Sequence, residues 1–426
     1  MFTLDVYLEI NGENTRIGAL TADSFSDAKF TYDRDYLDNP NARALSISLP
    51  LTDETFSPER TRNYFEGMLP EGFLRRSVAQ KMRTEESDYI AMLAGLGKEC
   101  IGAVTITDGE MLSPAPAYER LTMNQMREIA REGATKSVQV VMKTHLSLTG
   151  ASGKVGLYYE PDDMTWYLPL GNAPSTHIVK QSHVRLDSIV ANEQLSLLTA
   201  KKLGIDVPSC HIINTGDAGE DEVLFATERY DRKKKTDGKC LNGLDVPVRL
   251  HQEDFAQALS IAPINKYESE GGHYMKDMFD LLNKYSASPI EDRLKLWDII
   301  VFDYLIGNTD NHVKNVSLVY SENLRTVRLA PAYDILSTVI YESSTRDMGF
   351  SIGGELCIDK ITRNHFKAAA KECGLGEKMA MTRFDKLANG FEEALSNSAY
   401  ELANREIFAT LNLRERILKQ RGGILQ

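Results

Sequence analysis

The stretch Gly307-Asn308-Thr309-Asp310-Asn311-His312-Val313-Lys314-Asn315 decides the fold class that we assign to this chain of 426 residues. It holds seven polar residues among nine and follows a segment, Pro289 to Ile306, whose second half is apolar nearly all round. Such an apolar segment is typical of a helix buried in a core. Residues 316–330 then predict a β-hairpin that returns to Tyr333 and Asp334. The polar loop is thus placed between a buried helix and a hairpin.

Asp310, Asn315 and Asp334 follow one another in the order found in phosphotransferase active sites. The first aspartate of such a site orients the attacking hydroxyl and accepts its proton. The asparagine and the second aspartate offer hard oxygen ligands to Mg²⁺ on the phosphates of ATP. Asp310 and Asn315 alone fit equally well an Asn/Asp-rich turn that satisfies its own backbone. Asp334, placed after the hairpin, favours the catalytic interpretation.

Upstream, Thr149-Gly150-Ala151-Ser152-Gly153-Lys154 lies directly before a predicted strand. Its small residues would let backbone N–H groups approach phosphates. It is not a Walker A motif, because Leu148 stands where the first glycine belongs and Val155 where Ser or Thr belongs. By itself, a simple hairpin turn explains this stretch as well.

Two further segments complete a kinase-like order. Lys180 ends a predicted strand, Thr176 to Lys180, and precedes a predicted helix with Glu193, as does the lysine–glutamate pair that holds the α- and β-phosphates in kinases. Glu228-Arg229-Tyr230-Asp231 falls where predicted strands give way to helices, the place for an adenine-contacting hinge. Alone, a solvated lysine and a charged strand end explain these residues. The collinear order of all the parts predicts a kinase.

Along the whole chain, the sequence predicts three regions. They are an N-terminal subdomain over 1–108, a linker and β-rich lobe over 109–231, and a helical lobe over 232–426. In the first region, Leu4 to Ile10 alternate at strand period before the turn pair Asn11-Gly12. Two helices are predicted there, one capped by Ser57 and one capped by Ser87, followed by a strand from Cys100 to Ile106. Prolines mark residues 113–117 as a linker.

Composition narrows the class of protein. Lys+Arg 49 against Asp+Glu 61 give a net charge of −12, which argues against wholesale binding to nucleic acid or acidic membranes. The basic run Arg232 to Lys235 is expected to be a solvated loop. The five cysteines form no Cys-x-x-Cys pair, the histidines show no metal-ligand spacing, and no apolar run approaches the roughly 20 residues of a membrane span. We therefore expect a cytoplasmic protein.

Several motifs resemble one family across nearly the whole chain. In the first region they are Phe30-Thr31-Tyr32, Leu45-Ser46-Ile47-Ser48-Leu49-Pro50 and Leu69-Pro70-Glu71-Gly72. Later ones are Gln252-Glu253-Asp254-Phe255, Lys266-Tyr267-Glu268, Asp310 to Asn315 and Pro331-Ala332-Tyr333-Asp334-Ile335. The chain thereby resembles the HipA family of bacterial serine/threonine kinase toxins. The resemblance implies a two-lobed, protein-kinase-like α+β fold with an extra N-terminal α/β subdomain.

The resemblance also implies roles for individual residues. Asp310 would be the catalytic base, Asn315 and Asp334 the magnesium ligands, and Ser147 the autophosphorylated residue. The residues that would contact the nucleotide are Thr149, Gly150, Ala151, Ser152, Gly153, Lys154, Lys180, Glu228, Arg229, Tyr230, His312, Lys314 and Tyr333. The family's loop resembles Gly-Ala-Gln-x-Lys, and this chain has Ser152 in place of the Gln. Ser152 and Thr149 thus become rival phosphorylation sites.

The function that follows is an ATP- and Mg²⁺-dependent protein kinase acting as the toxin of a type II toxin–antitoxin system. The resemblance implies a HipB-like helix-turn-helix antitoxin as partner, contact with DNA only through that antitoxin, and a protein substrate; aminoacyl-tRNA synthetases are among the family's targets. Two alternatives stay open: a small-molecule kinase of the aminoglycoside type, which shares the Asp-x-x-x-x-Asn arrangement, and a pseudokinase that acts as co-repressor.

Overall fold

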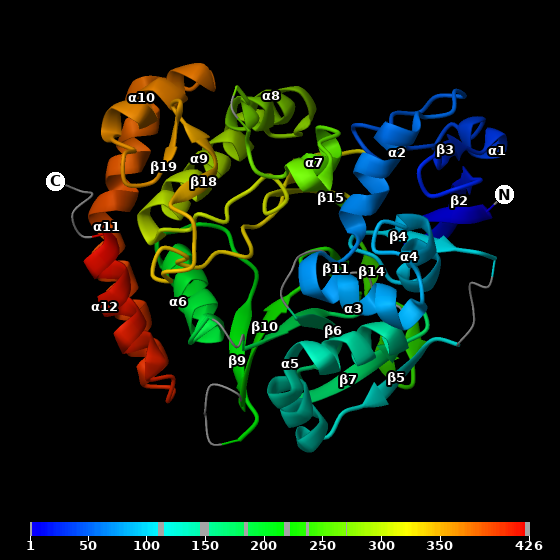
Figure 1. Cartoon of the computed structure of the whole chain (residues 1–426), viewed down its shortest axis with the longest axis horizontal. Coiled ribbons are helices and arrows are strands. Elements are labelled where there is room, and N and C mark those ends of the chain that lie inside the picture. Colours follow the sequence, from blue (N-terminus) through cyan, green and yellow to red (C-terminus); the bar gives the residue numbers. More distant parts are fainter. Residues whose placement is uncertain are drawn as a thin grey trace.

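The structure, a computed structural model, describes residues 2–109, 115–144, 153–182, 186–216, 222–235, 238–269 and 271–421. An N-terminal subdomain lies against a lobe built on a β-sheet and a lobe built mainly of helices (Figure 1). This architecture confirms the α+β fold class that the sequence predicts. Within the described ranges, no helix is both long and apolar enough to cross a membrane.

The N-terminal subdomain is built on an antiparallel sheet in the order β3-β2-β1-β4. Its strands are β1 (Phe2–Ile10), β2 (Glu13–Ala22), β3 (Lys29–Tyr32) and β4 (Val104–Thr107). Asn11 and Gly12 have φ angles of 54° and 83°, so they form the two-residue hairpin turn that the sequence predicts. Leu4, Val6 and Leu8 are buried at the predicted period of two.

The helices of this subdomain cover one side of the molecule in Figure 1. They are α1 (Arg34–Leu37), α2 (Pro58–Phe65), α3 (Gly72–Met82) and α4 (Tyr89–Leu96). Ser57 caps α2 as predicted, because its side chain accepts the N–H of Arg60. The predicted cap of α4 was wrong by one residue: Asp88, not Ser87, accepts the N–H of Ala91 at 2.9 Å.

The strand predicted from Cys100 to Ile106 forms only from Val104 onward. Gly102 has a φ of 73°, its N–H donates to Asp231 Oδ2 at 2.7 Å, and its carbonyl accepts from Arg232 Nη1 at 2.9 Å. These contacts use the backbone groups of Gly102 that a strand would pair. They tie the subdomain to the residues that follow β10.

The β-rich lobe holds an antiparallel sheet in the order β5-β7-β6-β8-β10-β9. Its strands are β5 (Ala117–Arg120), β6 (Lys154–Glu160), β7 (Thr165–Leu170), β8 (His177–Gln181), β9 (Cys210–Asn214) and β10 (Val223–Glu228). Lys154 pairs with Lys180, and Lys180 pairs with Phe225. Residues opposite one another share a face of the sheet. Both lysines therefore point to the face that carries α6 (Ile189–Lys202).

A long helix, α5 (Met123–Thr144), covers the other face of this sheet. Met126, Ile129 and Ala130 pack there against Val155 and Val179. No helix was predicted from the sequence for this segment, which lies between the predicted linker and the predicted phosphate loop. The predicted linker 113–117 lies partly outside the described residues, and β5 already begins at Ala117.

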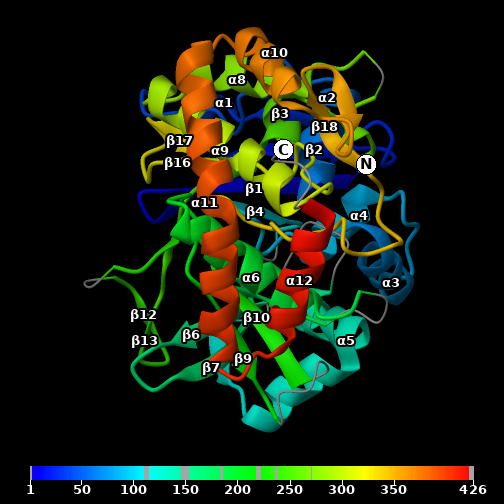
Figure 2. The same cartoon turned by 90° about the vertical axis from the view of Figure 1, so that its left-hand side faces the viewer.

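The helical lobe contains the predicted buried helix with the predicted bounds, α9 (Pro289–Ile306). Around it lie α7 (Phe255–Ala258), α8 (Tyr274–Tyr285), α10 (Arg363–Glu372), α11 (Glu377–Ala403) and α12 (Ala409–Arg421). A small sheet of β15 (Gln252–Asp254), β16 (Ser317–Tyr320) and β17 (Val327–Leu329) contains the predicted hairpin, and β18 (Asp347–Ile352) pairs with β19 (Glu355–Cys357). Figure 2 shows α11 running along the molecule, beside α6 and α12.

Short strands fill the segment between the lobes: β11 (Arg232–Lys233) pairs with β14 (Val248–Arg249), and β12 (Cys240–Leu241) pairs with β13 (Leu244–Asp245). The prediction that Arg232 to Lys235 form a solvated loop was wrong for Arg232. The Arg232 side chain is 1% exposed and ion-paired, whereas Lys233 and Lys235 both reach the more exposed Glu322.

Candidate active site

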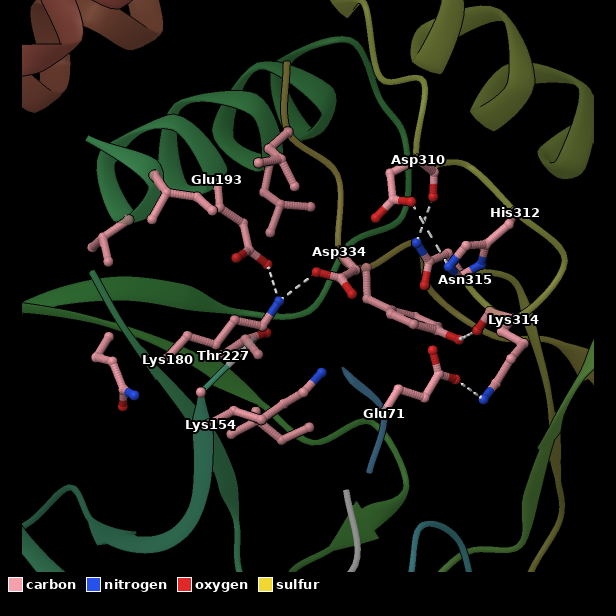
Figure 3. A pocket seen from close by; sticks show the side chains of 18 of the residues that line it. Glu71, Lys154, Lys180, Glu193, Thr227, Asp310, His312, Lys314, Asn315 and Asp334 are labelled. Carbon is pink, nitrogen blue, oxygen red and sulfur yellow. Dashed lines mark hydrogen bonds and ion pairs between the residues drawn. The ribbon is translucent and has the colours of Figure 1, made fainter. Parts of the chain in front are cut away.

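A cavity of about 1390 Å³ opens between the two lobes and the N-terminal subdomain. Residues from β6, β8 and α6 line it on one side, and the loop after α9 lines it on the other. The N-terminal subdomain adds residues from the start of α3. Figure 3 shows charged side chains from all three parts around this space.

Lys180 stands at the centre of the charged groups in the cavity. Its Nζ donates to Glu193 Oε1 and to Asp334 Oδ1, both at 2.6 Å, and the side chain also lies over the ring of Phe225 (Figure 3). Burial alone would lower the pKa of Lys180, but the carboxylates of Asp334 and Glu193 raise it well above its ordinary value. Lys180 is therefore a fixed cation, paired with the helix glutamate that the sequence predicts.

Asp334 carries two signs of a functional residue. It has a φ of 57°, in the left-handed region that costs energy for any residue but glycine and is concentrated at functional sites. Burial alone would raise the pKa of its carboxyl, yet Lys180 and Lys154 hold that pKa well below its usual range. Asp334 thus keeps its negative charge inside the cavity.

The polar loop 307–315 places Asp310 at the other side of the cavity. The amide Nδ2 of Asn315 donates to the carbonyl of Asp310 at 2.7 Å, which fixes the loop and leaves the Asn315 amide oxygen for a cation. The hydroxyl of Tyr267 donates to the Asp310 carboxylate. Partial burial raises the pKa of Asp310, and the Tyr267 hydrogen bond opposes that rise. A carboxylate so placed can accept a proton from a bound hydroxyl.

His312 and Tyr333 support this loop. His312 is buried, and burial together with the nearby Lys266 lowers its pKa to about 3, so the ring is neutral. Its ring stands edge-on to that of Tyr267, with centroids 5.0 Å apart. The Tyr333 hydroxyl lies 2.6 Å from Ser317 Oγ and donates to the Lys314 carbonyl at 2.9 Å. Both residues line the cavity, as a nucleotide contact requires.

The segment 228–231 also lines the cavity, as predicted for a hinge. The Tyr230 hydroxyl donates a hydrogen bond to the side-chain oxygen of Gln252. The Arg229 guanidinium, however, is 1% exposed and pairs with Glu99 and Asp231, so its charge is used in the protein interior. A nucleotide contact from Arg229 would therefore have to come from its backbone.

The predicted phosphate loop is described only at its end. Ser147 and Thr149 to Ser152 lie outside the described residues. Gly153 and Lys154 line the cavity, and the Lys154 side chain points into it (Figure 3). Burial lowers the pKa of Lys154.

Glu71 also lines the cavity, and no role was predicted for it from the sequence. Its carboxylate accepts from Lys266 Nζ at 2.6 Å and from Lys314 Nζ. The sequence feature that could have indicated Glu71 was the motif Leu69-Pro70-Glu71-Gly72, which predicted the family but no role for this residue. Its distance along the chain, more than 190 residues from either lysine, hides this contact.

Comparison with known proteins gives consistent matches over most of the chain. A family model for the HipA N-terminal domain matches residues 5–107, and one for the HipA-like C-terminal domain matches residues 146–395. "Putative kinase Y4mE" of Sinorhizobium fredii is 32% identical over 391 residues, 89% of each chain. "Putative kinase Y4dM" of the same organism is 24% identical over 369 residues, 83% of this chain and 82% of that one.

A solved structure matches the fold along the whole chain. It is the complex of HipA, HipB and operator DNA from Shewanella oneidensis MR-1, with a TM-score of 0.75 at 21% identity over 99% of this chain and 98% of that one. The two lobes and the cavity between them define a protein-kinase-like fold. The chain belongs to the HipA family, as its matches to both family domains and to Y4mE show.

Proposed function

We propose that this protein is an ATP-dependent serine/threonine kinase that acts as the toxin of a type II toxin–antitoxin system. The observation that carries the proposal is Lys180, whose ammonium joins Glu193 and Asp334 at 2.6 Å each inside the interlobe cavity. A lysine held by a helix glutamate, beside a metal-binding aspartate, is how protein kinases hold the phosphates of ATP. Relatives that are named as kinases support the proposal.

Each cavity residue has a place in phosphoryl transfer. Asp310 orients the acceptor hydroxyl and takes its proton, with Tyr267 fixing the orientation of the carboxylate. Lys180 and Lys154 attract the phosphates from the sheet side. The segment 228–231 borders the space for adenine. Because the reaction needs little covalent chemistry from the protein, positioning and charge do most of the work.

The donor atoms of the site fit magnesium. Asn315 and Asp334 present an amide oxygen and a carboxylate, which are the hard ligands that Mg²⁺ prefers. Within the described ranges, no group of three or more His, Cys, Asp or Glu side chains could hold a metal ion by itself. This also suits Mg²⁺, which is held by one or two protein oxygens together with phosphates and water. When bound, the ion would neutralise charge on the transferred phosphoryl group.

Replacement of Asp310 by Asn tests the proposal, with Asp162→Asn in the exposed turn between β6 and β7 as matched control. We expect wild type and control to transfer phosphate from Mg·ATP, and Asp310→Asn to be slower by about 10²–10⁴-fold. ADP release and growth arrest on expression are the measurements. A folded Asp310→Asn protein with full activity would overturn the kinase assignment. A wild type without transfer that still acts with an antitoxin on DNA would favour the co-repressor.

Self-phosphorylation is part of the proposal. A phosphate on Ser147 adds about −1.5 to −2 charges, which would repel the phosphates of ATP and weaken its binding. We expect wild type to carry phosphate on Ser147 and the Asp310→Asn protein to carry none. Intact mass and peptide mapping decide this. Phosphate only on Ser152 or Thr149 would move the regulatory site into the loop.

The expected partner is a small HipB-like helix-turn-helix antitoxin. The solved complex of the Shewanella protein contains HipA, HipB and operator DNA, and this chain shares that HipA fold. With a net charge of −12, this chain would reach DNA through the antitoxin. Co-purification with a helix-turn-helix protein encoded next to it is the test, and the absence of any complex would contradict the proposal.

A further inference from the structure

Glu71 brings a charge from the N-terminal subdomain into the cavity. It precedes the first residue of α3 and gives no side-chain cap to that helix. Its two carboxylate oxygens instead pair separately, Oε2 with Lys266 at 2.6 Å and Oε1 with Lys314. Figure 3 shows the contact of Glu71 with Lys314. The Lys314 side chain is 3% exposed and those of Glu71 and Lys266 are 18% exposed, so the bridge is largely withdrawn from water.

In the sequence, each of the two lysines directly precedes a residue that contacts the catalytic base Asp310. Lys266 is followed by Tyr267, whose hydroxyl donates to the Asp310 carboxylate. Lys314 is followed by Asn315, whose amide donates to the Asp310 carbonyl at 2.7 Å. One carboxylate thus joins the two segments that hold Asp310 from either side.

The subdomain does not need this bridge to stay attached. Away from Glu71, Glu99 pairs with Arg229 and Arg232, and Asn63 donates to the Ser260 carbonyl at 2.7 Å. Withdrawing a carboxylate from water is costly, and only its partners offset that cost. A charged bridge beside Asp310 is therefore better explained by what it does to the site than by attachment.

The carboxylate of Glu71 also contributes a negative charge to the cavity. Burial alone would raise its pKa, but Lys314 and Lys266 lower it to about 2, so the group is ionised at neutral pH. Near Glu71 the cavity also holds the carboxylates of Glu193, Asp310 and Asp334 and the ammonium groups of Lys154, Lys180, Lys266 and Lys314. Neutralising Glu71 would remove one negative charge from this region, which reduces its repulsion of a triphosphate.

We propose that Glu71 is a positioning residue of phosphoryl transfer, through which the N-terminal subdomain fixes Lys266 and Lys314, and with them Tyr267 and Asn315, around Asp310. The inference rests on the proposed kinase function and extends it to a residue outside the two kinase lobes. It requires that transfer is slowed while binding of the nucleotide is not weakened. Losing the Glu71 charge slows transfer while nucleotide triphosphate binds at least as tightly as before.

The experiment compares Glu71→Gln and Glu71→Asp with Asn63→Ala, which removes a contact between the subdomain and α7's C-terminal end without entering the cavity. Full-length proteins are titrated with Mg²⁺ and a non-hydrolysable ATP analogue, and with AMP, which lacks the distal phosphates. ADP release gives kcat and KM. Circular dichroism and thermal unfolding check that each variant is folded.

For Glu71→Gln we expect a 10- to 100-fold fall in kcat, since small displacements of reacting groups have effects of this size. Affinity for the analogue should be unchanged or up to about tenfold tighter, because the cavity loses one negative charge. Affinity for AMP should not change. Glu71→Asp should restore the analogue affinity of wild type and recover part of kcat. Asn63→Ala should keep both kinetic constants.

Several outcomes would overturn the inference. Equal kcat in wild type and Glu71→Gln would show that the bridge does not position the site. Joint loss of kcat, analogue affinity and thermal stability would assign Glu71 a structural role only. A wild type that binds the analogue but transfers no phosphate would overturn the proposed function. The analogue affinities of wild type and Glu71→Gln would then still measure the effect of the Glu71 charge on binding. A weaker analogue affinity of Glu71→Gln in that case would remove the inference as well.

Discussion

Two of the ionic contacts that the N-terminal subdomain makes with the two lobes differ in character. At the hinge, Glu99 pairs with Arg229 and Arg232, which also pair with Asp231, and all four side chains are 1–5% exposed. In the cavity, Glu71 pairs with Lys266 and Lys314, and exposure rises to 18%. The first contact is buried in the protein interior, and the second lines the cavity between the lobes.

This difference separates a structural contact from a functional one. The hinge network uses arginines, whose planar groups bind carboxylates with several hydrogen bonds, and it also binds the backbone of Cys100 and Gly102. The cavity contact uses lysines, which are point charges that a phosphate can also attract. The hinge contact should therefore dominate stability, while the cavity contact should dominate activity.

Replacement of Glu99 by Gln should give the largest loss of stability. It leaves Arg229 and Arg232 buried with only Asp231 as a carboxylate partner, and breaking a buried pair in this way costs about 3–5 kcal/mol. Urea unfolding followed by circular dichroism measures it. The exposed pair Arg34–Asp38 supplies the control, since Asp38→Asn should change the free energy of unfolding by less than about 0.5 kcal/mol. A loss below 1 kcal/mol for Glu99→Gln would contradict a structural role for the hinge.

A second buried carboxylate at the same subdomain boundary should make stability depend on pH. Glu253 accepts from Ser46, from the Ile47 N–H at 3.1 Å and from Tyr320, and burial raises its pKa to about 7. Between about pH 4.5 and 7 the unfolded chain releases this proton while the folded chain keeps it. Folding stability contributed by Glu253 is therefore complete at low pH and falls as pH rises through this window.

Glu253→Gln removes that titration. Relative to the variant, wild type should lose up to about 3 kcal/mol between pH 4.5 and 7, which is the free energy equivalent of the pKa change. The difference between the two unfolding free energies is the quantity to follow, because other groups titrate equally in both proteins. A difference that stays constant across this range would mean that Glu253 is ionised in the fold.

On the cavity side, Asp334→Ala should act on ligand binding. It removes a negative charge that would face Mg²⁺ in the proposed site, so we expect at least about a tenfold loss of Mg²⁺-dependent nucleotide affinity, or about 1.4 kcal/mol. Asn315→Ala removes an uncharged oxygen and should cost less. Thermal-shift titration with and without Mg²⁺ measures both. An unchanged Mg²⁺-dependent shift in Asp334→Ala would place the metal elsewhere.

The sequence predicted local structure best where pattern and turn chemistry agree. The bounds of α9 followed from its apolar run between Pro289 and the left-handed Gly307. Helix α5 was missed because Gly133-Ala134-Thr135 interrupts its apolar spacing, and because short strands surround it. The buried state of Arg232 could not be inferred either. Only its contact with Glu99, 133 residues away, explains why a member of a basic run lies in the interior.

The candidate site shows the same limit. Asp310, Asn315 and Asp334 lie close enough along the chain for motif spacing to predict a common loop and hairpin. Lys180 and Glu193 could be predicted by order along the chain, and the structure brings them together with Asp334. Glu71 could not, because its role depends on how the N-terminal subdomain packs against the other lobes. Long-range ionic contacts leave no periodic signal in one sequence.

The smallest expected effect belongs to Asn63→Ala, which tests whether the hydrogen bond of Asn63 acts separately from the cavity contact of Glu71. The Asn63 amide donates to the Ser260 carbonyl at 2.7 Å, and losing one such hydrogen bond at a partly buried site costs about 1 kcal/mol. Combined with Glu71→Gln, its effect on the free energy of unfolding should be additive, because distant residues without shared partners add within about 0.5 kcal/mol. Urea unfolding of the two single variants and the double variant measures this. Coupling of more than about 1 kcal/mol would mean that the subdomain moves as one body when either contact is lost, and the effect of Glu71 on the cavity could then not be separated from attachment of the subdomain.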